Sequence, residues 1–472
     1  MQPINTSDLT FLNMDRPTNL MVVNGVLWFD EEPDWDAVRD VIQERLIDRF
    51  PVLSCRAAQV DGNWVWEEDP DFSLDNHVRH IDLDGDLSDA QEYVSGRLSD
   101  PMNRDHALWE VDFLSGLPRE DGQPAAMMMA RFHHAVADGI RIVQLLLSMC
   151  DMKTDGAPPK VGRGSSRRSP LGKVANVSRR LASDVLDIVS GVGVAAIRLP
   201  QQMMSGGVDL TPVKLADAIT GTASPDNLLA NTMRSVSRLS MAGRRPDLTG
   251  DGPLGVEKRV SWVTGLPVST VKDIGKAHGA TVNDVLVSVV SRGLSRFVEE
   301  QGRPLADDVS WLIPISLKPI DMNLPAELGN YFAMVVFPMP LGISTTDGLL
   351  KEVRNRMDRL KNSTEAMIVF GLQKVVAATP EAVSVGLTEF VANKTLGVLT
   401  NVPGPRAPMY LAGTEVTGVL GWVPTAADQP LGICIFSYNG TVSMGIAADA
   451  AVVGDPGRLA DLIVEEFEAM AG

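Results

Sequence analysis

Residues Ala125 to Gly139 read Ala-Ala-Met-Met-Met-Ala-Arg-Phe-His-His-Ala-Val-Ala-Asp-Gly, and a second apolar run follows over Ile140–Met149. The first run, Ala125–Phe132, is continuous and short, which is typical of a strand buried on both faces. The second run is long enough for a buried helix. The sequence therefore predicts a strand, a turn that carries two histidines, and a helix as the central unit of the fold.

Strand and helix patterns continue on both sides of this unit. Before it, Met21–Phe29 reads as a strand, Asp34 opens a helix over Trp35–Arg49, and Ser88 is expected to cap a helix over Ser88–Leu98. Further strands are expected at Trp64–Trp66, Arg259–Val263, Val309–Ile315, Tyr331–Phe337, Leu396–Val402, Ile433–Tyr438 and Val442–Ala447, and further helices at Val268–His278, Asn283–Glu300 and Pro456–Met470.

The chain length divides these elements into domains. At about 150 residues per domain, 472 residues correspond to two or three domains. After residue 152 the composition changes to Gly, Ser, Pro and basic residues, and the αβ rhythm resumes near Lys258. We therefore expect an α/β protein with one αβ unit at residues 1–152, a crossover linker with helices at 153–257, and a second αβ unit at 258–472.

Composition and charge limit the classes of partner. Lys and Arg number 42 against 60 Asp and Glu, and this net charge of −18 argues against sequence-independent binding to nucleic acid. The three cysteines form no disulfide framework or CxxC motif, and no secretory signal is visible, so a cytoplasmic setting is expected. The longest apolar helical stretch, Val185–Leu199, is shorter than the roughly 18 residues that span a bilayer.

A cluster of basic residues lies between Lys160 and Arg180. Charge runs usually keep a linker in water, and this is the first interpretation. The alternative is an electrostatic tether to anionic lipid, with Val185–Leu199 lying at the interface, which would place the protein peripherally on the inner membrane or on lipid droplets.

The histidine pair carries the strongest chemical signal. His134 is expected where a buried strand ends, so its imidazole can face a cleft and take a proton from an alcohol or thiol. His133 is expected chiefly to shape the turn. Asp138, beside Gly139, either orients the imidazole or locks the loop, and the sequence does not separate these two roles.

Two other interpretations of the histidines remain open. A histidine with an aspartate four residues later is often structural. A metal site is the other alternative, but the remaining histidines show no zinc-site spacing and no cysteine is near, so no metal is expected; these histidines are His77, His80, His106 and His278.

The segment His133–Gly139, HHxxxDG, resembles the signature of the bacterial wax ester synthase/diacylglycerol acyltransferases, within the chloramphenicol acetyltransferase-like superfamily. The resemblance runs from Ser7-Asp8 to about Met470. It includes Phe72–His80, where the histidines are expected to be structural, and Asp100–Glu110, where Ala107 replaces the family's Pro but Leu108 and Trp109 are kept. Core packing is the favoured role of Trp109, and contact with substrate is the alternative.

Further matching motifs lie in the second half. Gly279–Leu286 is similar to the family's Asn-Asp motif, in which Asn283 is a candidate hydrogen-bond donor to substrate and Asp284 is expected chiefly to cap a helix. Asn401–Pro405 fits the late Asn-Val-Pro-Gly-Pro motif, with Asn401 as a candidate substrate neighbour, and Ser437–Gly440 fits the hairpin that follows it. The motifs Pro314–Lys318 and Gly329–Tyr331 differ from the family at their last residue, with Lys318 in place of Arg and Tyr331 in place of Gln.

The resemblance implies two chloramphenicol acetyltransferase-like αβ subdomains with mixed sheets and an active-site tunnel between them. It also implies an O-acyltransferase that moves a long-chain acyl group from acyl-CoA to a fatty alcohol or diacylglycerol. His134 would act as general base, in a direct attack without an acyl-enzyme and without a cofactor. Catalytic roles would fall to His134, His133 and Asp138, and substrate contacts to Gly139, Asn283, Asp284, Trp109 and Asn401.

Two rival functions stay open at this point. One is another acyltransferase of the same superfamily that uses a shorter acyl donor or a different alcohol. The other is a lipid-binding protein that keeps the fold but has lost turnover; the intact HHxxxDG and Asn283 argue against it. No GxSxG elbow is present, which agrees with direct transfer rather than hydrolysis through an acyl-serine.

Overall fold

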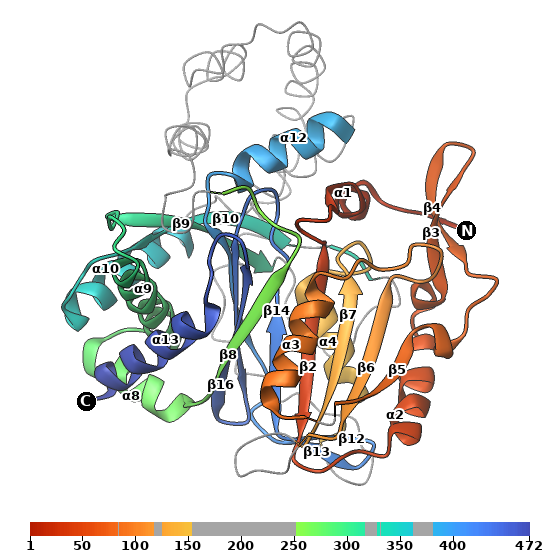
Figure 1. Cartoon of the computed structure of the whole chain (residues 1–472), viewed down its shortest axis with the longest axis horizontal. Helices are drawn as coiled ribbons and strands as arrows, with labels where there is room; N and C mark the ends of the chain where they lie inside the picture. Colours follow the sequence, from red (N-terminus) through yellow and green to blue (C-terminus); the bar gives the residue numbers. More distant parts are fainter. Residues whose placement is uncertain (84, 118–124, 153–251, 317–327, 331, 362–380) are drawn as a thin grey trace, which may run out of the picture.

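The computed structural model describes residues 1–83, 85–117, 125–152, 252–316, 328–330, 332–361 and 381–472 (Figure 1). These residues form two αβ halves, each built on a mixed sheet. The sheet of the first half has the order β14-β2-β7-β6-β5, with bounds Gly418–Trp422, Val22–Phe29, Ala126–His133, Trp109–Ser115 and Val78–Asp82. In this sheet β5 and β6 run parallel and the other neighbours antiparallel.

The sheet of the second half has the order β10-β9-β11-β15-β16-β8, with bounds Phe332–Pro340, Asp308–Ser316, Gly397–Pro403, Leu431–Tyr438, Thr441–Asp449 and Lys258–Pro267. Here β11 runs parallel to both of its neighbours, β9 and β15. Four helices gather beside this sheet in Figure 1, namely α8 (Val268–His278), α9 (Val282–Glu300), α10 (Thr346–Lys361) and α13 (Pro456–Ala471). Their apolar side chains and those of the sheet form one core cluster.

Small elements complete the described chain. They are β1 (Gln2–Pro3), α1 (Thr6–Met14), a three-stranded sheet in which β4 (Asn63–Glu68) pairs with both β1 and β3 (Cys55–Val60), 3-10 turns at Pro51–Ser54 and Leu74–Asn76, α12 (Glu381–Ala392), and the pair β12 (Met409–Leu411) and β13 (Thr414–Val416). In Figure 1, α1 lies over the end of β7, close to α12.

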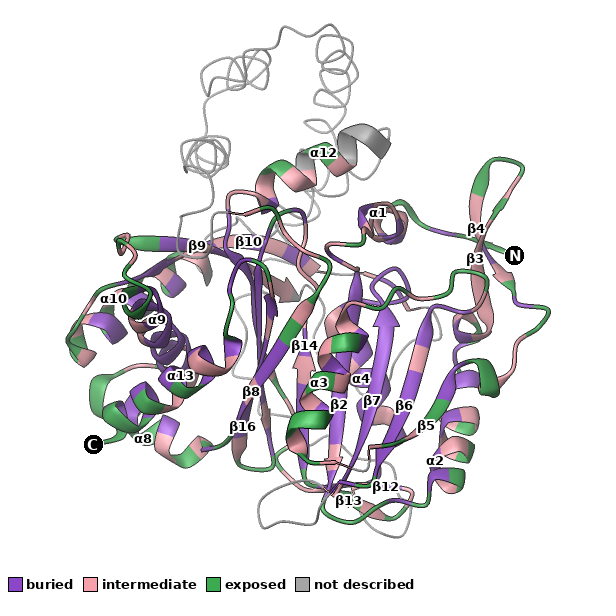
Figure 2. Ribbon diagram, viewed as in Figure 1, coloured by how far each residue is buried: buried purple, intermediate pink, exposed green. Residues whose placement is uncertain are grey.

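The predicted central unit is confirmed. Strand β7 is buried along its whole length, as Figure 2 shows, and α4 (Gly139–Met149) follows the histidine turn. Side chains alternate along the strand, so Met127 and Met129 pack in a cluster with residues of α3 (Leu87–Leu98), whereas Met128 packs in a cluster with α2 (Trp35–Ile42) and α4. Burial on both faces is the physical reason why the run from Ala125 to Ala130 is continuously apolar. Arg131 is buried in the same strand, where its guanidinium pairs with Glu110.

The two halves are joined by contacts between segments far apart in the sequence. Strand β14 comes from residues 418–422 but pairs with β2 of the first sheet. Helix α3 covers the edge strand β8, where the Ser95 hydroxyl accepts a bond from Val260 N at 3.0 Å and Gln91 donates to Val260 O at 2.6 Å. These side chains satisfy backbone groups that an edge strand otherwise leaves unpaired.

The expected division at residues 1–152, 153–257 and 258–472 stays a prediction. Residues 153–251, including the basic cluster, lie outside the described part of the chain. Strand β14 belongs by sequence to the third segment and by pairing to the first sheet, so the sheets do not follow the division strictly.

Glycines set the distance at which β14 crosses β16. A Cβ placed on Gly445 would lie 2.1 Å from the carbonyl oxygen of Gly421. We expect Gly445→Ala to lower the free energy of unfolding by at least about 1–3 kcal/mol. The new methyl group would clash with the backbone of Gly421, which cannot move aside as a flexible side chain can. Chemical denaturation measures this. Gly96→Ala, in the exposed part of α3 where a Cβ meets nothing within 4 Å, is the control and should be neutral or stabilising; equal effects of the two substitutions would contradict the close crossing.

Several predicted boundaries differ from the structure. Ser88 does not cap α3; Asp86 does, accepting a bond from Ser88 N at 2.7 Å, because Asp89 completes a capping box with it. The helix predicted over Trp35–Arg49 ends its α-helical part at Ile42 and continues as a π-helical turn over Gln43–Ile47. Helix α1, which Asn5 caps, was not predicted, and Tyr331 and Lys318 lie outside the described residues.

Candidate active site

His134 stands at the end of β7, where β2 and α1 cover it. Its backbone N donates to Met21 O at 2.7 Å, which continues the β2–β7 ladder beyond the strand. Its ring stacks on Phe11 of α1, with the centroids 4.1 Å apart and the planes inclined by 17°. Phe332 lies on β10 with its ring centroid 5.5 Å away. The two aromatic side chains come from opposite halves of the chain, so the imidazole lies where the halves meet.

Burial decides the charge of His134. The residue is 8% exposed. This burial lowers the pKa of the imidazole to about 4, although its own carbonyl group and Asn330 act in the opposite direction. The ring is therefore neutral at pH 7, and the neutral imidazole is the form that accepts a proton.

His133 contacts its own turn and Asp15, a residue that precedes β2. Its Nδ1 accepts a bond from Ala135 N at 3.1 Å, which places its proton on Nε2, 3.6 Å from Asp15 Oδ2. Burial acts to raise the pKa of Asp15, but the contact with His133 and the bonds from Met21 N and Arg104 together lower it below its usual value. Asp15 also accepts from Met21 N at 2.7 Å, so His133 and the start of β2 meet at one carboxylate. That His133 chiefly shapes the turn stays a prediction, which its bond from Ala135 N supports.

Asp138 caps the helix that follows the histidines. Its Oδ1 accepts a bond from Arg141 N at 2.9 Å, and its own N donates to Gly329 O at 3.3 Å. Of the two roles left open by the sequence, these contacts support locking of the loop. The bond to Gly329 also ties the loop to the second half of the chain.

Gly139 begins α4, and a Cβ built on it would meet no atom within 4 Å. Protein packing therefore does not require glycine here. We expect Gly139→Ala to leave stability unchanged or raise it by up to about 1 kcal/mol, and to raise KM severalfold if substrate occupies the open space. Denaturation and initial-rate measurements test this, and an unchanged KM would remove Gly139 from the substrate contacts.

Asn283 and Asn401 meet in the second half, although they are far apart in the sequence. Asn401 Nδ2, on β11, donates to Asn283 Oδ1, in the first turn of α9, at 3.0 Å. Asp284 forms a capping box with Thr281, whose backbone N donates to Asp284 Oδ2 at 2.8 Å. These contacts are those of a helix cap, which is the role expected for Asp284.

Trp109 and the remaining histidines make structural contacts. The Trp109 indole is buried in the core of the first half and donates to Leu53 O at 2.7 Å, and His77 stacks on it at 4.5 Å while its Nδ1 faces Trp109 O at 2.8 Å. The other three histidines bond to Ser115, Asp69 and Asp347. Within the described residues no group of three or more His, Cys, Asp or Glu side chains could hold a metal ion.

Asn330 and Asp8 were not among the predicted site residues. Asn330 Nδ2 donates to Asp8 Oδ1 at 2.8 Å and to His134 O at 2.9 Å. The signals available in the sequence were the family matches at Ser7-Asp8 and Gly329–Tyr331, and an Asn5-x-x-Asp8 capping pattern that opens α1. These signals did not show that residues 8, 134 and 330 meet.

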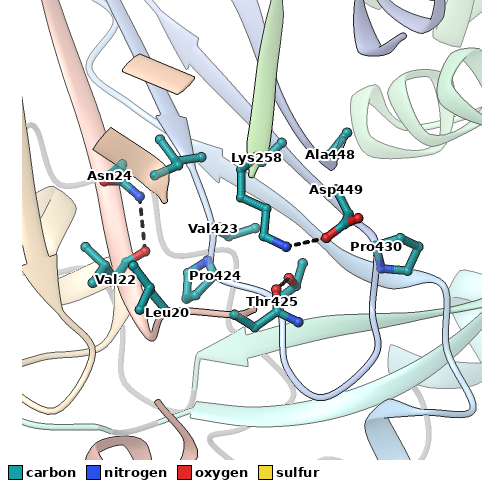
Figure 3. Close-up of a pocket in the computed structure, with 13 residues that line it drawn as sticks. Leu20, Val22, Asn24, Lys258, Val423, Pro424, Thr425, Pro430, Ala448 and Asp449 are labelled. Atoms are coloured by element: carbon teal, nitrogen blue, oxygen red, sulfur yellow. Dashed lines mark hydrogen bonds and ion pairs between the residues drawn. The ribbon is translucent and has the colours of Figure 1, made fainter. Parts of the chain in front are cut away.

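A cleft lies between the halves, on the face of the first sheet that carries Asn24 (Figure 3). The Lys258 ammonium in it donates to Asp449 at 2.5 Å. The rest of the lining mixes apolar side chains, such as Leu20 and Pro424, with polar ones, such as Asn19 and Thr425. His134 is not among the lining residues. The predicted active-site tunnel therefore stays a prediction. Across the described chain no helix combines the length and apolar character needed to cross a membrane.

Comparison with solved structures shows the fold. The wax ester synthase/diacylglycerol acyltransferase from Marinobacter aquaeolei VT8 aligns with a TM-score of 0.67 and 18% identity over all of this chain and 98% of that one. The starter condensation domain of the rhizomide synthetase RzmA, in complex with C8-CoA and Leu-SNAC, aligns with a TM-score of 0.55, 11% identity and coverage of 100% and 93%. The predicted α/β fold with two chloramphenicol acetyltransferase-like halves is confirmed.

Sequence comparison shows the family. The wax ester synthase/diacylglycerol acyltransferase catalytic domain matches residues 4–286, and the WS/DGAT C-terminal domain matches residues 328–471. The probable diacylglycerol O-acyltransferase tgs1 of Mycobacterium tuberculosis (strain ATCC 25618 / H37Rv) is 24% identical over 474 residues, covering 98% of this chain and 94% of that protein. With the HHxxxDG histidine buried between the two halves, the chain belongs to the wax ester synthase/diacylglycerol acyltransferase family of acyltransferases.

Proposed function

We propose that this protein transfers a long-chain acyl group from acyl-CoA to the hydroxyl of a fatty alcohol or diacylglycerol, with His134 as general base. The observation that carries the proposal is the neutral, buried imidazole at the end of β7, within HHxxxDG. The name of the relative tgs1 supports a diacylglycerol acceptor, and the acyl-CoA bound by the condensation domain of the same fold supports the donor.

The proposed reaction is a direct transfer. The acceptor hydroxyl gives its proton to the imidazole while its oxygen attacks the thioester carbonyl, and collapse of the tetrahedral intermediate breaks the C–S bond. The leaving thiolate then takes the proton from the imidazolium, so the products are an ester and free coenzyme A, and His134 returns to its neutral form. No acyl-enzyme, metal or cofactor takes part in this scheme.

Other residues support the scheme. Asn401 donates to Asn283 Oδ1, so the Asn283 amide is oriented with its Nδ2 as the donor that remains for a substrate or oxyanion oxygen. Phe11 and Phe332 cover the imidazole and keep water, the competing acceptor, away from it. Asp138 holds the turn between His134 and α4.

The test is an assay with purified protein, palmitoyl-CoA and either hexadecanol or a diacylglycerol, in which free thiol and ester are measured together. Ester and thiol that rise in step establish acyl transfer and rank the two acceptors. Thiol without ester indicates hydrolysis or a wrong acceptor. An arm with octanoyl-CoA tests a shorter donor, and lipid binding without any thiol release would favour the non-catalytic alternative.

A further inference from the structure

Three segments far apart in the sequence meet at one amide group. The Asn330 side chain, from the second half, uses both hydrogens of its Nδ2, one for Asp8 Oδ1 at 2.8 Å and one for the backbone carbonyl of His134 at 2.9 Å. A primary amide has two donor hydrogens on nitrogen and an acceptor oxygen at the other end. The donor end is therefore fully used by these two partners.

Asp8 fixes which way the amide points. Its carboxyl group is 4% exposed and also contacts the side chain of Asn5. Both carboxyl oxygens of Asp8 accept hydrogen bonds, Oδ1 from Asn330 and Oδ2 from Asn5. Asp8 therefore holds the Nδ2 end of Asn330 toward itself and directs Asn330 Oδ1 to the other side. Burial raises the pKa of Asp8 to about 7, Asp138 adds to this rise, and the bonds from Asn330 and Asn5 oppose it.

Two buried atoms at this place have no hydrogen-bond partner among the described residues, and they do not bond to each other in this structure. They are Oδ1 of Asn330, which is an acceptor, and Nδ1 of His134. Their chemistry is complementary when Nδ1 carries the proton. Burial lowers the pKa of His134, whereas its own carbonyl group and, to a lesser extent, the Asn330 side chain act to raise it, which is the effect of acceptors near the ring. Helix α1 also brings Phe11, one turn after Asp8, onto the same ring.

We propose that Asn330, oriented by Asp8, is a positioning residue for His134: its Oδ1 accepts the Nδ1 proton of the imidazole and keeps the Nε2 lone pair directed at the acceptor hydroxyl. This inference rests on the proposed role of His134 as base. In a catalytic triad a carboxylate holds the histidine base directly. Here the Asn330 amide would lie between the Asp8 carboxyl group and the His134 ring. It also makes the active base depend on both halves of the chain, since Asp8 and His134 come from the first and Asn330 from the second.

The experiment is a double-mutant cycle with Asp8→Ala, Asn330→Ala and the double variant. Each single substitution should lower kcat by about 10- to 100-fold with little change in KM, because a misplaced base slows the chemical step. The double variant should lose no more than the worse single variant, since both act through one chain of contacts. Asp8→Asn, which keeps an acceptor oxygen at this position, should recover most of the loss.

A second readout is independent of turnover. Nitrogen-15 NMR of labelled histidine reports the imidazole tautomer, and the Nδ1-protonated form should dominate in the parent protein and be mixed in Asn330→Ala. Thr10→Ala is the matched control, because Thr10 lies on the same helix and its hydroxyl donates to Thr6 O at 2.9 Å. It should leave kcat and the tautomer unchanged.

The outcomes separate the two proposals. Full activity in His134→Ala would overturn the proposed function. Loss of activity in His134→Ala together with normal kcat and an unchanged tautomer in Asp8→Ala and Asn330→Ala would overturn only the positioning role. Multiplicative losses in the double variant would also overturn it, because they would show that the two residues act independently.

Discussion

Replacing His134 by alanine is expected to lower turnover by about two to four orders of magnitude, the range for loss of a positioned general base. The reason is local: without the imidazole, the hydroxyl of the acceptor would have to attack the thioester while still protonated. The fold should survive, because the bond from His134 to Met21 O belongs to the backbone and does not depend on the side chain.

The measurement is kcat with palmitoyl-CoA and the better acceptor, with circular dichroism and thermal unfolding as checks on the fold. His80→Ala is the matched control, since this histidine contacts Ser115 on the neighbouring strand and lies away from the site. It should retain turnover close to that of the parent protein. Near-normal turnover in well-folded His134→Ala would mean that the imidazole does not act as the base.

Asp8 and His134 should give the folded state opposite pH dependences between about pH 4 and pH 7. The Asp8 pKa is raised from 3.8 to about 7, so its contribution to stability is fully present below 3.8 and is lost as the pH rises to about 7. The His134 pKa is lowered from 6.5 to about 4, so its contribution is present above 6.5 and is lost as the pH falls to about 4.

These shifts are large enough to measure. At 1.36 kcal/mol for each pKa unit, they correspond to about 4 kcal/mol for Asp8 and about 3 kcal/mol for His134. The two changes nearly cancel in the parent protein, because burial favours the uncharged forms of both side chains. Removing either titratable group should expose the pH dependence of the other.

The free energy of unfolding, measured by chemical denaturation from pH 4.5 to pH 7.5, tests this balance. Relative to the parent protein, Asp8→Asn should lose stability as the pH falls, whereas His134→Gln should lose stability as the pH rises. Other titrating groups are common to all three proteins and cancel in the differences. Parallel curves for the two variants would show that burial does not hold these side chains uncharged.

Local pattern predicted the elements that surround His134, the proposed base. The apolar run before His133, the turn, and the helix after Asp138 depend on neighbours in sequence, because side-chain alternation and helix capping act over a few residues. The hairpin between β15 and β16 is a similar case, since Asn439 and Gly440 adopt the positive φ values of 44° and 86° that its tight turn requires. The polarity of the turn and its two histidines likewise identified the base as a candidate before any contact was known.

Only the tertiary structure decided the contacts that complete the site. The pairing of β14 with β2, the cover of β8 by α3, and the contact of Asp8 and Asn330 with His134 join residues that lie far apart along the chain. Such contacts form because two folded surfaces are complementary in shape and hydrogen bonding. The short-range periodicity of the sequence does not predict this complementarity. The sequence alone therefore determined the histidine turn and proposed its chemistry. The burial that keeps the imidazole neutral, and the contact of Asn330 with His134, arise only when the two halves pack together.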